Sequence, residues 1–180
     1  MGNQQARRAQ RTSTISSKFS TEFFATRNDR WLTPLDIVNA LGQFDLDPCG
    51  APGHATAETI WTPELVGDGL AMPWAGRVWL NPPYGRTMRA WVERLVEHGS
   101  GVALLPVGTG TKLWQDVIFP NVTAIHWWRH RINFIREDAP EEMTSPTESV
   151  LLAFSEFDAD AIAGSDLPGH LTRYVKDKAA

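Results

Sequence analysis

The sequence predicts an α/β domain with a mostly parallel sheet and helices on both of its faces. Two patterns lead to this prediction. Apolar strand-like runs alternate with amphipathic helical segments, and residues 102–107 are apolar at consecutive positions, as in a strand covered on both faces. The 180 residues, 42% hydrophobic and 21% charged, suit one folded domain and exclude a wholly disordered chain.

Local signals place each element along the chain. Thr33 is expected to be the N-cap of the first helix, because Pro34 suits the first helical position. Gly99 closes a helix whose apolar side chains recur at helical spacing. The expected elements are, in chain order, a helix over 34–41, strands over 44–47 and 77–80, a helix over 87–98, a strand over 102–107, a helix over 111–119, and strands over 123–128 and 149–154.

The charge is distributed unevenly along the chain. Residues 1–30 hold six positive and two negative side chains, or +4, whereas residues 31–180 hold 11 positive and 19 negative ones, or -8. We expect residues 1–20 to form a flexible basic arm and residues 21–180 to form a single domain. Residues 137–148 are expected to be a polar, acidic loop. On an acidic body, any contact with nucleic acid has to be local, through arginine clusters.

Several classes of protein are excluded by what the sequence lacks. A single cysteine, Cys49, allows no internal disulfide, and we expect it to be a small buried residue and not a nucleophile. The five histidines show no metal-ligand spacing, so no metal is expected. No apolar run approaches the length of a membrane span, and the amino terminus does not resemble a secretory signal. We expect a cytoplasmic protein without membrane contact.

The most informative segment is Asn81-Pro82-Pro83-Tyr84, which directly follows an apolar strand. The two prolines remove backbone donors, so that carbonyl oxygens dominate the turn, and Asn81 adds a side-chain acceptor. Two such oxygens can accept both hydrogens of a planar amino group, while the ring of Tyr84 can stack on the substrate. The segment therefore predicts a site for an exocyclic amine, with Asn81, Pro82 and Tyr84 as catalytic residues.

With this motif the chain resembles the phage-type DNA N6-adenine methyltransferases, the phage Dam family, over roughly residues 20–155. The resemblance implies a Rossmann-like, class I methyltransferase fold, S-adenosylmethionine (SAM) as cofactor, double-stranded DNA as partner and a phage or prophage origin. The segments that carry it are Trp31-Leu32-Thr33-Pro34, Phe44-Asp45-Leu46-Asp47-Pro48-Cys49, Asp68-Gly69-Leu70 with Trp74, Asn81-Pro82-Pro83-Tyr84-Gly85, Leu104-Leu105-Pro106, Thr111-Lys112 with Trp114, and Arg131-Ile132-Asn133-Phe134.

The resemblance also implies roles for individual residues. Residues Thr33-Pro34 and Asp47-Pro48 would lie along the methionine part of SAM, with Asp68 near its ribose or adenine. Trp31 is a candidate for the same pocket, and Asn81 would lie between cofactor and base. A glycine-rich cofactor loop of the usual pattern is replaced by residues 47–53. The residues expected to contact nucleic acid are Pro83, Arg86, Arg89, Arg129 and Arg131.

Two alternatives remain open on the sequence alone. The same motif serves methylation of RNA bases and of protein glutamine amides, which are also planar amino groups. A protein that keeps the fold but binds DNA without catalysis, such as an anti-restriction protein, is the other alternative. The recognised DNA sequence, the oligomeric state and the choice between phage and host DNA do not follow from the residues.

Overall fold

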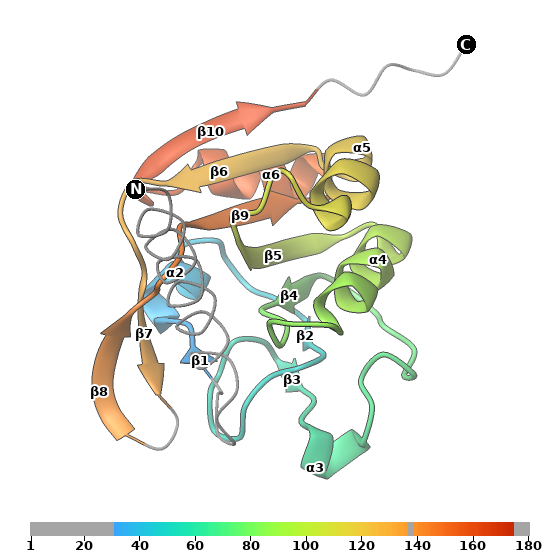
Figure 1. Ribbon diagram of the computed structural model, residues 1–180. Helices are drawn as coiled ribbons and strands as arrows, with labels where there is room; N and C mark the ends of the chain where they lie inside the picture. Colours follow the sequence, from blue (N-terminus) through green and yellow to red (C-terminus); the bar gives the residue numbers. More distant parts are fainter. Residues whose placement is uncertain (1–30, 137–138, 175–180) are drawn as a thin grey trace, which may run out of the picture.

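The computed structural model describes residues 31–136 and 139–174, so the expected arm of residues 1–20 lies outside the described part. The elements form a seven-stranded sheet of order β10-β6-β9-β5-β4-β2-β3 and a three-stranded sheet of order β1-β7-β8 (Figure 1). Their bounds are β1 Trp31–Leu32, α2 Leu35–Asn39, β2 Leu46–Asp47, β3 Thr59–Ile60, α3 Pro63–Val66, β4 Val78–Leu80, α4 Met88–His98, β5 Gly101–Pro106, the π-helix η1 Trp114–Ile118, α5 Phe119–Asn121, β6 Ala124–Trp128, β7 Asn133–Arg136, β8 Ala139–Thr144, β9 Ser149–Ala153, α6 Glu156–Ala163 and β10 Gly169–Arg173.

The larger sheet is mixed and not mostly parallel as the sequence predicted. Three of its pairings, β2 with β3, β2 with β4 and β4 with β5, are parallel, whereas the pairings of β9 with β5 and β6 and of β10 with β6 are antiparallel. The cause is the connection between β6 and β9. This connection is the β7–β8 hairpin and not a crossover helix. The chain therefore returns to the sheet at the end where β6 finished, and β9 runs antiparallel to β6.

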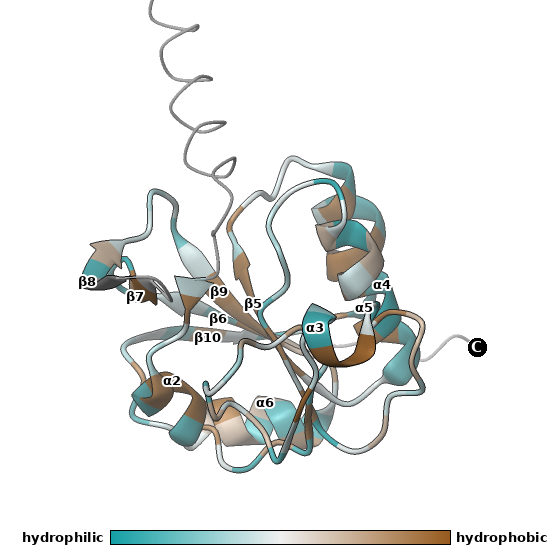
Figure 2. Cartoon of the chain, turned by 90° about the horizontal axis from the view of Figure 1, so that it is seen from below, coloured by the Kyte–Doolittle hydropathy of each residue, from teal (hydrophilic) through white to brown (hydrophobic). Residues whose placement is uncertain are grey.

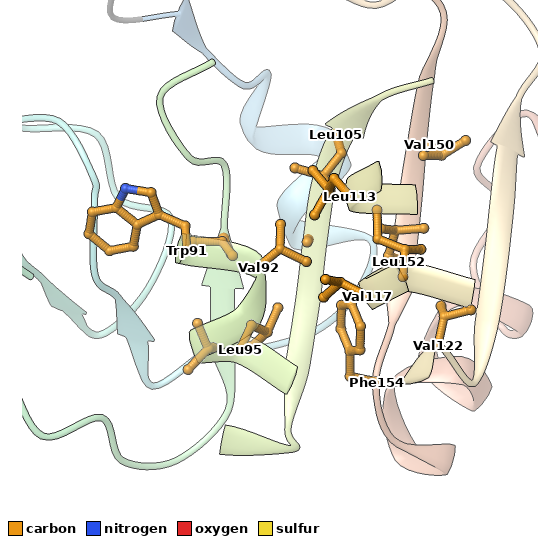
Figure 3. Packing of buried hydrophobic residues seen from close by; sticks show 14 of the residues in the cluster. Trp91, Val92, Leu95, Leu105, Leu113, Val117, Val122, Val150, Leu152 and Phe154 are labelled. Atoms are coloured by element: carbon orange, nitrogen blue, oxygen red, sulfur yellow. The ribbon is translucent and has the colours of Figure 1, made fainter. Parts of the chain in front are cut away.

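Helices cover both faces of the larger sheet, as predicted (Figure 2). Successive strand residues point to opposite faces, so Val78 and Leu80 of β4 pack on the α4 side and Trp79 on the α2 and α6 side. Figure 3 shows the first cluster, in which Val92 and Leu95 of α4 lie beside β5 and η1. These two buried layers fix β4, and with it the position of the segment that follows.

Two further differences from the predicted elements concern the second half of the chain. Part of the expected acidic loop is the strand β8, because the segment folds back on β7 and pairs with it from Asn133↔Thr144 onward. The helix α6 and the strand β10 were not expected from the sequence. The predicted helix over 111–119 is present in part, as the π-helix η1. Pro120 has no N–H to donate to the carbonyl of Asp116, so the regular α-helical hydrogen bond cannot form there. Within the described residues, no helix is long and apolar enough to cross a bilayer.

Candidate active site

The side chain of Asn81 is held by two hydrogen bonds at the end of β4. Its Nδ2 donates to the backbone carbonyl of Trp31 at 3.1 Å and to Oγ1 of Thr33 at 3.2 Å. A carbonyl oxygen can only accept, so the amide is oriented with its nitrogen toward Trp31. Among the described residues, none donates to Oδ1 of Asn81, which leaves this oxygen as an acceptor for a ligand.

The residues after Asn81 form the expected donor-poor turn. Pro82 is buried, Pro83 is exposed and Tyr84 is half-buried. Burial raises the pKa of the Tyr84 phenol above its ordinary value, so the ring stays neutral at physiological pH. The turn combines two prolines, which lack an N–H, with uncharged side chains, which suits a neutral planar ligand.

Thr33 lies in the same network but does not cap a helix. The N-cap of α2 is Pro34, without a side-chain hydrogen bond, so the prediction of a Thr33 cap is wrong. The Thr33 hydroxyl accepts instead from Asn81, and the side chain is only 1% exposed. The carbonyl oxygen of Thr33 accepts from Nε2 of His54 at 2.9 Å, which ties residues 50–57 to the same place.

Asp47 shapes the loop that follows β2. Its Oδ1 accepts from the backbone N–H of Cys49 at 3.1 Å and its Oδ2 from the hydroxyl of Thr56 at 2.5 Å. The residue is 3% exposed, and burial raises its pKa from 3.8 to about 6, against the two hydrogen bonds, which lower it. Asp47 is therefore a buried carboxylate whose charge would be favoured by a nearby cation.

Cys49 joins this loop to the Asn81 turn. Its thiol donates to the backbone carbonyl of Asn81 at 3.5 Å. The pKa of the thiol is raised well above its ordinary value, mainly by burial and to a smaller extent by the negative charge of Asp47. A thiol held in its protonated form is a poor nucleophile, so the contact of Cys49 with Asn81 is structural.

Asp68 approaches from the other side of the same loop. The Asp68 side chain is exposed and its Oδ1 accepts from the N–H of Leu70 at 2.9 Å. The next residue, Gly69, lies so close to Pro48 that a Cβ built on it would come 2.1 Å from the Pro48 carbonyl oxygen. The structure thus brings the loop of Asp68 against the loop of Asp47 and Pro48, two segments that the sequence had placed on one cofactor.

The predicted basic residues fall into two kinds. The side chains of Arg86 and Arg129 are exposed, and neither has an ion pair among the described residues. Arg89 is paired with Glu93 at 2.7 Å and approaches Asp116 at 4.0 Å, while Arg131 is 3.3 Å from Glu148.

These basic residues share one edge of the sheet with Asn81. Strands β4, β5 and β6 run in the same direction, since β5 and β6 are both antiparallel to β9. Their carboxyl ends, followed by Asn81, Val107 and Arg129 in that order, form what we call the carboxyl edge. In open α/β sheets this is the edge at which ligands bind.

Three residues of the site were missed as functional by sequence reasoning: His54, Thr56 and Cys49 in its contact with Asn81. They sit in a loop of small residues without periodicity, where a partner can be known only from the fold. Within residues 31–136 and 139–174, no three histidine, cysteine or acidic side chains are grouped so that they could hold a metal ion.

Comparison with known proteins adds a family to this geometry. The model of the family described as DNA N-6-adenine-methyltransferase (Dam) matches residues 20–167. A DNA N-6-adenine-methyltransferase of Escherichia phage T1 is 27% identical over 109 residues, which cover 55% of this chain and 44% of the relative, so the match spans less than half of the relative's length. No solved structure matches the chain. The family match includes both sheets up to β9, together with Asn81 and the residues that hydrogen-bond to it, Trp31, Thr33 and Cys49. The chain therefore belongs to the DNA N-6-adenine-methyltransferase (Dam) family.

Proposed function

We propose that the protein transfers a methyl group from SAM to the N6 amino nitrogen of adenine in double-stranded DNA. The observation that carries the proposal is the orientation of Asn81. Its amide nitrogen is engaged by Trp31 and Thr33, so Oδ1 remains as an acceptor on the residue that precedes the two prolines. Membership of the Dam family supports the same reaction and substrate.

The chemistry follows from acceptors alone. Oδ1 of Asn81 and the carbonyl oxygen of Pro82 accept the two amino hydrogens of an adenine that has been flipped from the duplex. These bonds draw the nitrogen lone pair out of conjugation with the ring, and the ring of Tyr84 stacks on the base. Bond formation between the amino nitrogen and the methyl carbon would break the bond from that carbon to the SAM sulfur, which would leave as a neutral thioether. The nitrogen would afterwards release a proton to water, so no side chain has to act as a base first. Positioning supplies most of the rate.

The residues beside Asn81 fit the proposed cofactor. SAM is a cation that supplies an electrophilic methyl group, and the loops present a buried carboxylate, Asp47, and an exposed one, Asp68, on segments in contact through Gly69 and Pro48. Trp31 and Pro34, both half-buried, complete that side of the proposed pocket, whereas Thr33 between them in sequence is buried. Five strands of the larger sheet run in one direction between layers of helices, which supports a Rossmann-like, class I assignment.

DNA contacts are proposed along the carboxyl edge. Pro83 is exposed on the turn next to the proposed base site, and Arg86, Arg89, Arg129 and Arg131 lie on segments that leave this edge. Arg86 and Arg129 are the stronger candidates for phosphate contacts, because Arg89 and Arg131 are already engaged by Glu93 and Glu148.

Methyl transfer from labelled SAM tests the proposal against its alternatives. The protein is incubated with unmethylated duplex DNA, with RNA of the same sequence and with a glutamine-containing peptide, and the labelled product is digested and identified. We expect label in DNA, as N6-methyladenine. Label in RNA alone or in the peptide alone would show that this molecule, and not DNA, is the methyl acceptor. DNA binding without SAM binding, measured by calorimetry, would favour a non-catalytic protein.

A further inference from the structure

The Asn81 amide is held by two contacts of very different kinds. One is the backbone carbonyl of Trp31, which any residue at position 31 would provide as long as the backbone keeps its place. The other is the hydroxyl of Thr33, which depends on the identity of one side chain. Together they engage Nδ2, which has two hydrogens to donate.

This orientation decides whether Asn81 attracts or repels an amino group. An asparagine amide rotated by half a turn exchanges its oxygen and nitrogen, and it would then present an NH2 group to the NH2 group of the base. In the structure such a rotation would place Oδ1 against the Trp31 carbonyl oxygen, which cannot donate, whereas the Thr33 hydroxyl could still donate to Oδ1. The Trp31 carbonyl therefore selects the orientation that can accept from an amine, and the Thr33 hydroxyl adds the second hydrogen bond, which fixes where the amide lies.

The Thr33 hydroxyl is not available to a ligand in this arrangement. The residue is 1% exposed, its hydroxyl accepts from Asn81 and its carbonyl accepts from His54. A cofactor that bonded the hydroxyl directly would have to enter a buried position next to the Asn81 nitrogen. The neighbouring Pro34 is half-buried and remains accessible.

We propose that Thr33 is a positioning residue, whose hydroxyl is the second hydrogen-bond partner of Nδ2 and holds the Asn81 amide where Oδ1 reaches the adenine amino group. The inference rests on the proposed function, because it assigns Thr33 a part in the same reaction. It gives Thr33 a role through Asn81 in place of the position along the methionine part of SAM that the family resemblance implied for it.

Two substitutions separate the hydroxyl from the shape of the side chain. Thr33→Val keeps the branched shape and removes the acceptor, whereas Thr33→Ser keeps the hydroxyl and removes a methyl group. For Thr33→Val we expect kcat for adenine methylation to fall by about 5- to 10-fold, as for the loss of one hydrogen bond, with unchanged Kd for SAM by calorimetry. Thr33→Ser should restore kcat.

Three results would overturn the inference while the wild type methylates adenine. They are an unchanged kcat in Thr33→Val, a raised Kd for SAM with unchanged kcat, and a Thr33→Ser variant as impaired as the valine variant. A merely structural threonine would lower thermal stability in both variants without this split between kcat and Kd. Failure of the proposed function is a different result, namely a wild type that forms no N6-methyladenine.

A spectroscopic measurement tests the contact without any activity. The side-chain 15N resonance of Asn81 is assigned by its loss in Asn81→Ala, and exchange of its two protons with solvent is measured in the free wild-type protein. We expect both protons to be protected, and one of them to exchange faster in Thr33→Val. Unprotected Asn81 protons in the wild type would overturn the proposal even if Thr33→Val failed to fold.

Discussion

At Asn81, the direction of one amide group decides which chemistry is available. The sequence could predict this residue, because its neighbours are two prolines and an apolar strand, and these are local features. The sequence could not predict that Nδ2 is taken up by Trp31 and Thr33, because these residues lie 50 and 48 positions away. The same holds for His54, whose contact with Thr33 joins two loops.

Asp47 is the residue for which pH gives the clearest prediction. Because burial raises its folded-state pKa to about 6, the folded protein holds a proton between about pH 4 and pH 6 that the unfolded chain has lost. The contribution of Asp47 to the free energy of unfolding therefore falls as pH rises through this window and stays low above it. Relative to wild type, Asp47→Asn should gain up to about 3 kcal/mol between pH 4 and pH 7.

Urea unfolding at several pH values between 4 and 7 measures this difference. Asp68→Asn, at an exposed carboxylate, controls for the change of charge. If the free energies of unfolding of wild type and Asp47→Asn stay parallel over the whole pH range, the pKa of Asp47 is not raised by burial, and the prediction is contradicted.

Among the elements, those of regular pattern were predictable and the short pairings were not. The strands β4, β5, β6 and β9 and the helix α4 lie close to their predicted ranges, because each has a continuous apolar or helical pattern. β1 and β8 have no such pattern. Both are defined by their pairing with β7, a contact between distant parts of the chain for β1. This pairing places Trp31 beside Asn81.

The contact between the Asp68 and Asp47 loops leads to a second prediction. Gly69→Ala would place a Cβ against the Pro48 carbonyl oxygen, so one of the two loops has to move. We expect a loss of about 1–3 kcal/mol of stability and a higher Kd for SAM by calorimetry. Gly110→Ala is the matched control, since a Cβ there meets nothing within 4 Å. Equal SAM affinity in the two variants would show that this contact does not shape a cofactor site.

At the scale of the whole molecule, the proposed DNA contact requires an acidic protein to bind a polyanion through a limited surface. The net charge is -4, yet exposed arginines without ion pairs among the described residues follow β4 and β6 at the carboxyl edge. The seven-stranded arrangement that creates this edge was not fully predictable. The β7–β8 hairpin replaces a crossover and reverses β9, although residues 137–148 read as a loop in sequence.

Salt dependence tests which arginines contact phosphate. Each phosphate contact contributes about 0.9 to the slope of log affinity against log salt concentration. Arg86→Gln and Arg129→Gln should each reduce this slope by about that amount in fluorescence anisotropy with a DNA duplex. Arg89→Gln, whose guanidinium is paired with Glu93, should change it less. A slope that responds to Arg89 and not to Arg86 or Arg129 would place the DNA elsewhere.

The role of Asn81 in methyl transfer is tested most directly by comparing wild type with Asn81→Ala in the presence of SAM and unmethylated duplex DNA. N6-methyladenine is quantified after digestion, and SAM affinity is measured in parallel by calorimetry. We predict that the substitution lowers methylation by at least about 100-fold, as for a group that stabilises charge in the transition state, with little change in SAM affinity. An Asn81→Ala variant that methylates adenine as fast as the wild type would contradict the role of the Asn81 oxygen.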